Sequence, residues 1–85
     1  MILNESKKHK KIEPEHMQLM KEIGNRIKKL RTEKNLGYIE MSMMIGLSRN
    51  EYNLIELGQV YFKFSTLLRI LDYHKISFSN FIKEL

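Results

Sequence analysis

Arg49, Asn50 and Asn53 are the residues of this 85-residue sequence whose chemistry and spacing point most directly to a function. Arginine and asparagine side chains carry planar sets of hydrogen-bonding groups, and each can bind two atoms on the edge of a nucleic-acid base. In a helix that turns about 100° per residue, Tyr52 and Ile55 define a buried face. The two asparagines, Leu54 and Leu57 lie on the opposite face, with Arg49 at its side near the N-terminal end. The pattern indicates recognition of base edges.

Catalytic and metal chemistry find little support in the sequence. Cysteine is absent, and His9, His16 and His74 lie far apart without carboxylate companions at ligand spacing. There is no glycine-rich phosphate loop and no nucleophile with a base at a recognised spacing. We therefore expect no enzyme activity, no metal site and no cofactor.

The charge balance favours a polyanionic partner. The sequence has 15 Lys+Arg against 10 Asp+Glu, a formal net charge of +5 and a pI of about 9.6. Residues 26–34 concentrate this charge, with Glu33 as the only acid among them. A second basic cluster, residues 7–11, is either a solvated tail or an arm that follows DNA phosphates.

The length and hydropathy of the chain further restrict the class of protein that it can be. At 85 residues it has room for one small domain. No apolar stretch approaches the ~20 residues that span a bilayer, and the first residues lack the apolar core of a secretory signal. We expect a cytoplasmic protein that does not bind membranes.

The spacing of apolar residues is helical and never alternates as in a strand. It predicts an all-α domain over residues 13–85, composed of a helical extension (13–22) and a core (23–85). Residues 1–12 show no periodicity, and we expect a flexible basic arm there.

Five helices are expected. Pro14 suits the first turn of the first helix, whereas Gly24 within it costs about 1 kcal/mol relative to alanine and allows a break. The five expected ranges are about 15–35, 38–45, 48–58, 65–74 and from 77 onward.

The strongest local signal lies between the second and third helices. Gly46 is suited to end a helix in a left-handed conformation. Ser48 is an N-cap with Glu51 three residues later, the spacing of a capping box. Leu47 and Tyr52 occupy the two positions of a hydrophobic staple. Two helices joined by so short a turn make a helix-turn-helix unit.

This unit resembles the Cro/phage-repressor type of helix-turn-helix domain. The resemblance implies a five-helix, lambda-repressor-like fold with an extended first helix, in which the third helix enters the DNA major groove. It runs from Ile23 to about Ile82 without a gap. The matching segments are Ile23-Gly24, Arg26-Ile27, Leu30-Arg31, Gly46-Leu47-Ser48-Arg49, Ile55-Glu56-Leu57-Gly58, Thr66-Leu67-Leu68-Arg69-Ile70-Leu71 and Ser77-Phe78.

The resemblance implies which residues face bases. Arg49, Asn50, Asn53 and Leu54 match the family positions at base edges. An apolar side chain at Leu54 departs from the polar residue that is common there, and it suits a thymine methyl group. Alternatively, Leu54 and Leu57 form part of a protein-binding patch.

Other residues are expected at phosphates. The position of Tyr38 usually holds glutamine in the family and touches a phosphate, and the Tyr38 hydroxyl can donate a hydrogen bond there. Ser48 is a second candidate beside its role as a cap. Lys28, Lys34 and Lys63 are expected to neutralise phosphates.

Arg31 and Glu56 match family positions that form a partly buried ion pair between the first and third helices. The alternative is two exposed charges that contribute almost nothing to stability. Glu51, which would repel phosphate if it projected freely, is explained by its place in the capping box.

Methionine is unusually common, with six residues. Met17 and Met20 extend the apolar stripe of the first helix, while Ile39, Met43 and Met44 occupy positions that are usually polar in the family. Either the first half of helix one folds against helix two and hides them, or they form a surface for a dimer or partner protein.

These observations favour a sequence-specific DNA-binding transcriptional regulator, a repressor that binds double-stranded DNA as a homodimer. Half-sites would lie about one helical turn, ~34 Å, apart. Phage-type repressor, restriction–modification controller and antitoxin all remain open. The rival hypothesis is a protein-interaction module, or antitoxin-type partner, that keeps the fold with weak or no base-specific binding.

Overall fold

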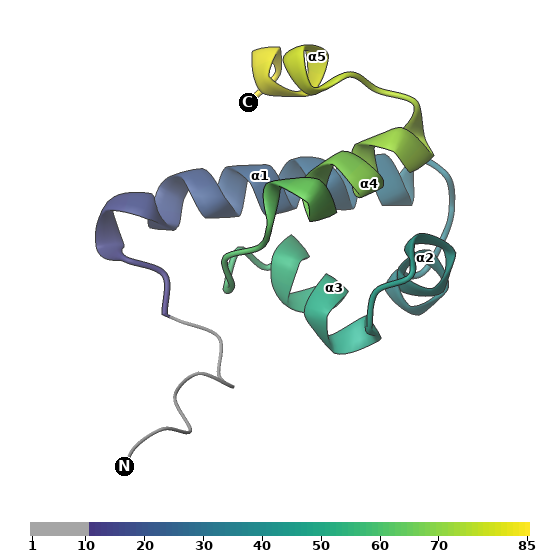
Figure 1. Ribbon diagram of the computed structural model, residues 1–85, viewed down its shortest axis with the longest axis horizontal. Coiled ribbons are helices and arrows are strands. Elements are labelled where there is room, and N and C mark those ends of the chain that lie inside the picture. Colours follow the sequence, from purple (N-terminus) through teal and green to yellow (C-terminus); the bar gives the residue numbers. More distant parts are fainter. Residues whose placement is uncertain (1–10) are drawn as a thin grey trace.

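The computed structural model describes residues 11–85, so most of the basic cluster at 7–11 lies outside the described part. Within it, all regular structure is helical, as predicted (Figure 1). The helices are α1 (Pro14–Thr32), α2 (Tyr38–Ile45), α3 (Arg49–Glu56), α4 (Phe64–His74) and α5 (Phe78–Lys83).

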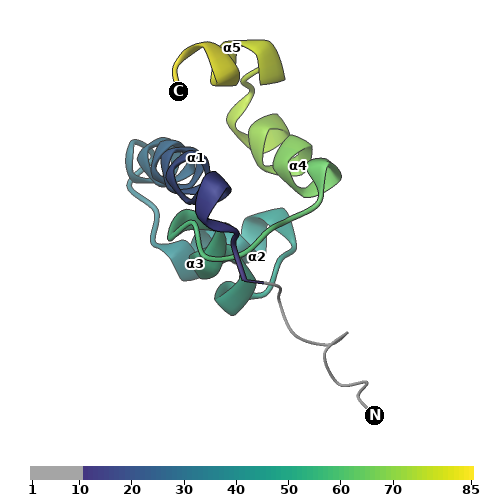
Figure 2. The ribbon, with the colours of Figure 1, turned by 90° about the vertical axis from the view of Figure 1, so that its left-hand side faces the viewer.

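The core lies between α1, the α2–α3 pair and α4. Viewed from the end in Figure 2, α1 and α4 flank the interior, α2 and α3 form its floor, and α5 lies above. The fully buried side chains come from every helix, because each contributes one apolar face. They are Ile27, Met41, Tyr52, Ile55, Ile70, Leu71 and Phe81.

Helix α1 is continuous through Gly24, so the break that this residue allows does not occur. Gly24 is buried where α1 crosses the end of α3. A Cβ atom there would lie 2.4 Å from the carbonyl oxygen of Glu56 and 2.6 Å from that of Ile55. Only glycine lets the two backbones approach so closely, which explains a residue that is otherwise unfavourable inside a helix.

The first turns of α1 pack against the α3–α4 loop. The Tyr61 hydroxyl accepts a hydrogen bond from the Glu13 amide at 3.1 Å and lies 2.7 Å from His16 Nδ1. Ile12, just before the helix, is buried. Within residues 11–85, no helix is long and apolar enough to cross a bilayer.

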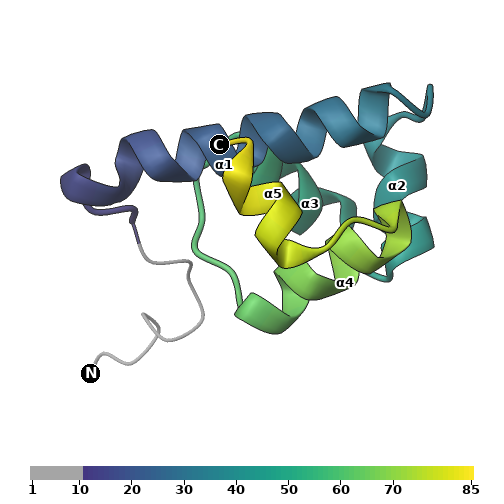
Figure 3. The same cartoon turned by 90° about the horizontal axis from the view of Figure 1, so that it is seen from above.

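This packing corrects one interpretation of the methionines. The first half of α1 does not fold against α2, which lies beside the opposite end of α1 (Figure 3). Met20 is buried at 8% exposure, but Met17 remains 48% exposed. The loop reaches α1 because Gly58, at φ 71°, brings its backbone against Lys21, leaving no space for a Cβ atom.

Candidate nucleic-acid interface

Helices α2 and α3 form the expected helix-turn-helix. Gly46 adopts a left-handed conformation, φ 84°, and both it and Leu47 donate backbone hydrogen bonds to the Ser42 carbonyl. Leu47 then packs against the core. The Ser48 hydroxyl accepts a hydrogen bond from the Glu51 amide at 3.0 Å, so Ser48 caps α3 as predicted.

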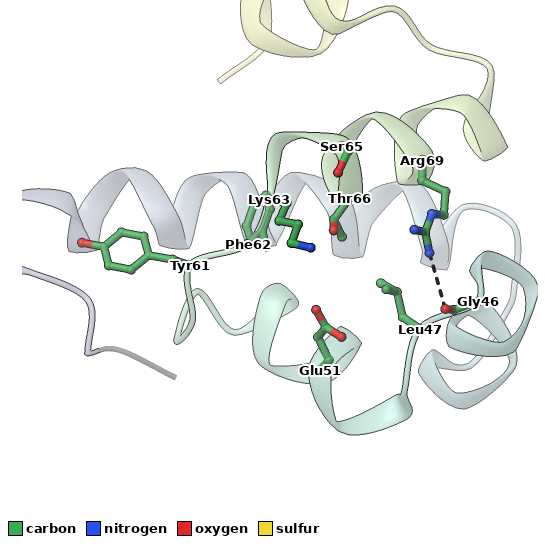
Figure 4. Close-up of a pocket in the computed structure, with 9 residues that line it drawn as sticks. All are labelled: Gly46, Leu47, Glu51, Tyr61, Phe62, Lys63, Ser65, Thr66 and Arg69. Atoms are coloured by element: carbon green, nitrogen blue, oxygen red, sulfur yellow. Dashed lines mark hydrogen bonds between the residues drawn. The ribbon is translucent and has the colours of Figure 1, made fainter. Parts of the chain in front are cut away.

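The expected capping box at α3 is only half formed. Glu51 does not return a hydrogen bond to the Ser48 amide; its side chain points toward the start of α4, where it lines a cavity of about 610 Å³ (Figure 4). A reciprocal bond of this kind occurs instead at α2, where the Gly37 amide donates to the Glu40 carboxylate at 3.0 Å. The explanation of Glu51 through a capping box is therefore wrong.

Arg69 of α4 is a structural residue of this unit that the sequence did not reveal. Its guanidinium donates to the carbonyl oxygens of Ile45 and Gly46 at 3.3 and 3.4 Å (Figure 4). A positive charge at the C-terminal end of α2 also interacts favourably with the helix dipole. Arg69 thus fixes the turn between α2 and α3 relative to α4.

The expected base-reading residues differ in accessibility. Arg49 and Asn50 are exposed, and Asn53 is partly buried. Leu54 is also partly buried and packs against the core, whereas Leu57 is 50% exposed. The most accessible side chains of this face are therefore Arg49, Asn50 and Leu57.

A cavity of about 400 Å³ lies between α1, α2 and α3. It brings together Tyr38, Lys28 and Asn53, which were assigned to DNA contacts separately in the sequence. Two further polar residues of α1, Lys21 and Asn25, line it as well. The complete lining is Lys21, Asn25, Lys28, Arg31, Tyr38, Asn53, Glu56 and Leu57.

The other two lysines expected at phosphates lie elsewhere. The Lys34 ammonium sits 5.8 Å from the centre of the Tyr73 ring, a cation–π distance that draws it toward α4. Lys63 is the N-cap residue of α4 and lines the cavity that Glu51 enters (Figure 4). The expected phosphate contacts are thus spread over three parts of the surface.

Arg31 and Glu56 both line the cavity beside Tyr38 and Asn53, and their side chains face each other there. Arg31 Nε donates to Glu56 Oε2 at 2.7 Å, and Nη2 donates to Oε1 at 3.0 Å. The two side chains are only 12% and 5% exposed. The alternative of two exposed charges does not describe this structure.

The environment keeps the Arg31 guanidinium charged and the neighbouring Tyr52 hydroxyl neutral. Hydrogen bonding to Glu56 raises the pKa of the Arg31 guanidinium. Burial raises the pKa of the Tyr52 hydroxyl well above its usual range, and the Glu56 carboxylate adds to this effect. The positive charge of Arg31 is therefore compensated within the protein.

Comparison with known proteins identifies the family. A family model described as a helix-turn-helix domain matches residues 24–83. The chain belongs to this helix-turn-helix family. The expected resemblance to helix-turn-helix domains of the Cro/phage-repressor type is confirmed.

A solved helix-turn-helix structure shares the fold. The crystal structure of the restriction-modification controller protein C.AhdI from Aeromonas hydrophila superposes with a TM-score of 0.70 at 24% sequence identity. The match covers 78% of this chain and 96% of C.AhdI. No curated protein sequence matches the chain.

Proposed function

We propose that this helix-turn-helix protein is a sequence-specific transcriptional repressor that binds its operator as a homodimer in the cytoplasm. Helix α3 lies in the major groove, with Arg49, Asn50, Asn53 and Leu54 at base edges. The observation that carries the proposal is the exposure of Arg49 and Asn50 at the start of α3, directly after the capped turn. In this family geometry the N-terminal residues of the recognition helix contact the bases.

Base reading and phosphate binding are divided between different elements. Helix α3 carries Arg49 against Glu51 and Glu56, so it adds no net positive charge. The positive charge comes mainly from α1, beside the reading helix. Phosphate contacts therefore supply most of the affinity and its salt dependence, while a few mostly neutral side chains supply the specificity.

An apolar surface on α4 and α5 supports a homodimer. Phe64 at the start of α4 is 56% exposed and meets Phe78 of α5 edge to face, with 5.0 Å between ring centres. Leu68, one turn along α4, is also exposed. We call this set the α4–α5 surface: Phe64, Leu68, Phe78 and Ile82. Pairing of two copies would remove it from water.

We propose the repressor role on the basis of how such a dimer would occupy DNA. A dimer presents two α3 helices to half-sites about one helical turn, ~34 Å, apart, and so requires an inverted repeat. A protein bound over such a site within a promoter excludes other proteins from the same groove. We propose steric exclusion as the means of repression.

A gel-shift titration of Arg49→Ala and Asn50→Ala tests the base-reading role. Each variant should lose discrimination between operator and random duplex, by about 1–3 kcal/mol for a bidentate contact. Arg69→Lys serves as a control for a general disturbance of the fold. It alters a side chain that supports the turn between α2 and α3 and that we do not place at the bases. Equal discrimination by the alanine variants and the unsubstituted protein would remove these residues from the reading role.

A second candidate function rests on α2. Met43 and Met44 are 75% and 60% exposed, and Ile39 beside them is also exposed. Flexible methionine surfaces adapt to protein partners. If DNA binding fails the gel-shift test, a protein-interaction module using this face is the favoured alternative, and a pull-down with and without DNA separates the two.

A further inference from the structure

Lys21 and Asn25 have no assigned role, yet they share a face of α1 with Lys28. Their spacing of four and three residues places all three on one stripe, about two turns long. All three are exposed, and all line the cavity that α1 forms with Tyr38 and the end of α3. Lys21 precedes the residues 24–83 that the helix-turn-helix family model covers.

The free charge of this cavity is positive. Arg31 and Glu56 compensate each other through two hydrogen bonds, and Arg31 Nη1 donates to the Leu36 carbonyl at 2.7 Å. Neither Lys21 nor Lys28 has an ion-pair partner among residues 11–85. The two ammonium groups therefore remain available to an external anion.

The neutral groups around the lysines add further donors. The Asn25 amide and the Tyr38 hydroxyl can both donate hydrogen bonds to oxygen. The Gly37 amide at the start of α2 is already bonded to Glu40, whereas the Tyr38 hydroxyl is a side-chain donor in the lining of this cavity. Ammonium, amide and hydroxyl donors around one cavity match the several acceptor oxygens of a phosphate group.

We infer that this cavity binds a phosphate of the DNA backbone, and that Lys21 and Asn25 hold it together with Lys28 and Tyr38. The inference rests on the proposed DNA binding. The position of Asn53 in the same lining supports duplex DNA as the source of the phosphate, because Asn53 lies on the reading helix. The helical extension thereby lengthens the DNA-binding surface beyond the helix-turn-helix domain.

The salt dependence of DNA affinity tests the inference. Binding of the selected operator and of a random duplex is measured from about 50 to about 300 mM salt for Lys21→Gln, Lys28→Gln and Asn25→Ala. Each lysine variant should reduce the magnitude of the slope of log affinity against log salt by about one. Asn25→Ala should weaken binding without changing the slope. All three should weaken both duplexes equally, because phosphates carry no sequence information.

Lys29→Gln is the matched control. It removes the same charge from the same helix, but Lys29 lines a different cavity with Glu22 and Glu84. This variant should retain the slope of the unsubstituted protein. An identical slope for Lys21→Gln and Lys29→Gln would overturn the inference while leaving the proposed function intact. Failure of the unsubstituted protein to bind any duplex would instead overturn the proposed function.

Two further measurements distinguish a DNA-phosphate contact from a loss of stability and from a site for free anions. Thermal unfolding of Lys21→Gln should be unchanged, because the side chain is exposed; a loss of stability that accounts for the weaker binding would contradict a contact role. Calorimetric titration with inorganic phosphate, without DNA, should give no saturable binding at millimolar concentration. Saturable binding there would identify a site for free anions and overturn the assignment to the DNA backbone.

Discussion

Arg31 on α1 and Glu56 at the end of α3 form a bidentate ion pair that is almost completely shielded from solvent. A third hydrogen bond joins Arg31 to the Leu36 carbonyl in the segment that leads into α2. One guanidinium therefore links α1, α3 and the entry to α2. The orientation of α3 therefore depends on this charged pair.

Glu56→Ala should lower the free energy of unfolding by about 3–5 kcal/mol, because it leaves the Arg31 charge buried without a partner. Urea denaturation measures this loss. Glu51→Ala, a carboxylate on the same helix without an ion pair among residues 11–85, should cost much less. An unchanged unfolding midpoint for Glu56→Ala would contradict the importance of the pair.

Gly24→Ala should destabilise the protein, although the same change normally stabilises a helix interior by about 1 kcal/mol. The new Cβ atom would lie 2.4 Å from the Glu56 carbonyl oxygen, so α1 and α3 must move apart. We expect a cost of about 1–3 kcal/mol, which thermal unfolding can measure. Asn25→Ala, at the next and exposed position, should be neutral or slightly stabilising. A more stable Gly24→Ala variant would show that the backbones are not in contact.

His74 should make the stability fall as the solution becomes acidic. Burial lowers the pKa of His74 below its ordinary value near 6.5, with the nearby Lys34 adding to the effect and Glu33 opposing it. The unfolded chain takes up a proton near that ordinary value while the folded protein resists it, so stability declines as pH falls through about 6.5. The decline continues until the folded protein also protonates.

Thermal unfolding at about pH 7.5 and about pH 5.5 measures this effect. His74→Gln should reduce the difference between the two midpoints. Equal pH dependence for His74→Gln and the unsubstituted protein would contradict the proposed origin of the effect.

Leu68→Glu should convert a dimer into monomers, because it places a charge within the apolar α4–α5 surface. Light scattering should give the mass of two chains for the unsubstituted protein and 10.2 kDa for the variant. Met43→Glu, on the exposed face of α2, should remain dimeric. The reverse result, with only Met43→Glu monomeric, would place the interface on α2.

Local signals were sufficient to predict the helices. The five helices match the expected ranges within a few residues, because caps, glycine stops and apolar spacing are encoded in short segments. Ser48 illustrates this: its hydroxyl and the Glu51 amide lie three residues apart, and their hydrogen bond forms as expected. The Glu51 side chain, by contrast, lies toward α4, a distant part of the chain.

Contacts between segments that are distant in the sequence could not be predicted from such local signals. Gly24 resembles a weak point in a helix until the carbonyl groups of α3 are placed beside it. Arg69 becomes a support for the turn only when α4 meets the end of α2. Lys21 and Asn25 join the cavity for the same reason, since their neighbours come from α2 and α3. The family resemblance supplied the Arg31–Glu56 pair, which periodicity alone does not predict.

Selection of bound sites from random duplex DNA tests the central claim most directly. The claim is that two copies of the protein read bases through α3 of each copy. We predict enrichment of an inverted repeat whose half-sites are centred about one helical turn, ~34 Å, apart. Recovery of sequences with no common element would contradict base reading by this helix-turn-helix, whatever its affinity for DNA.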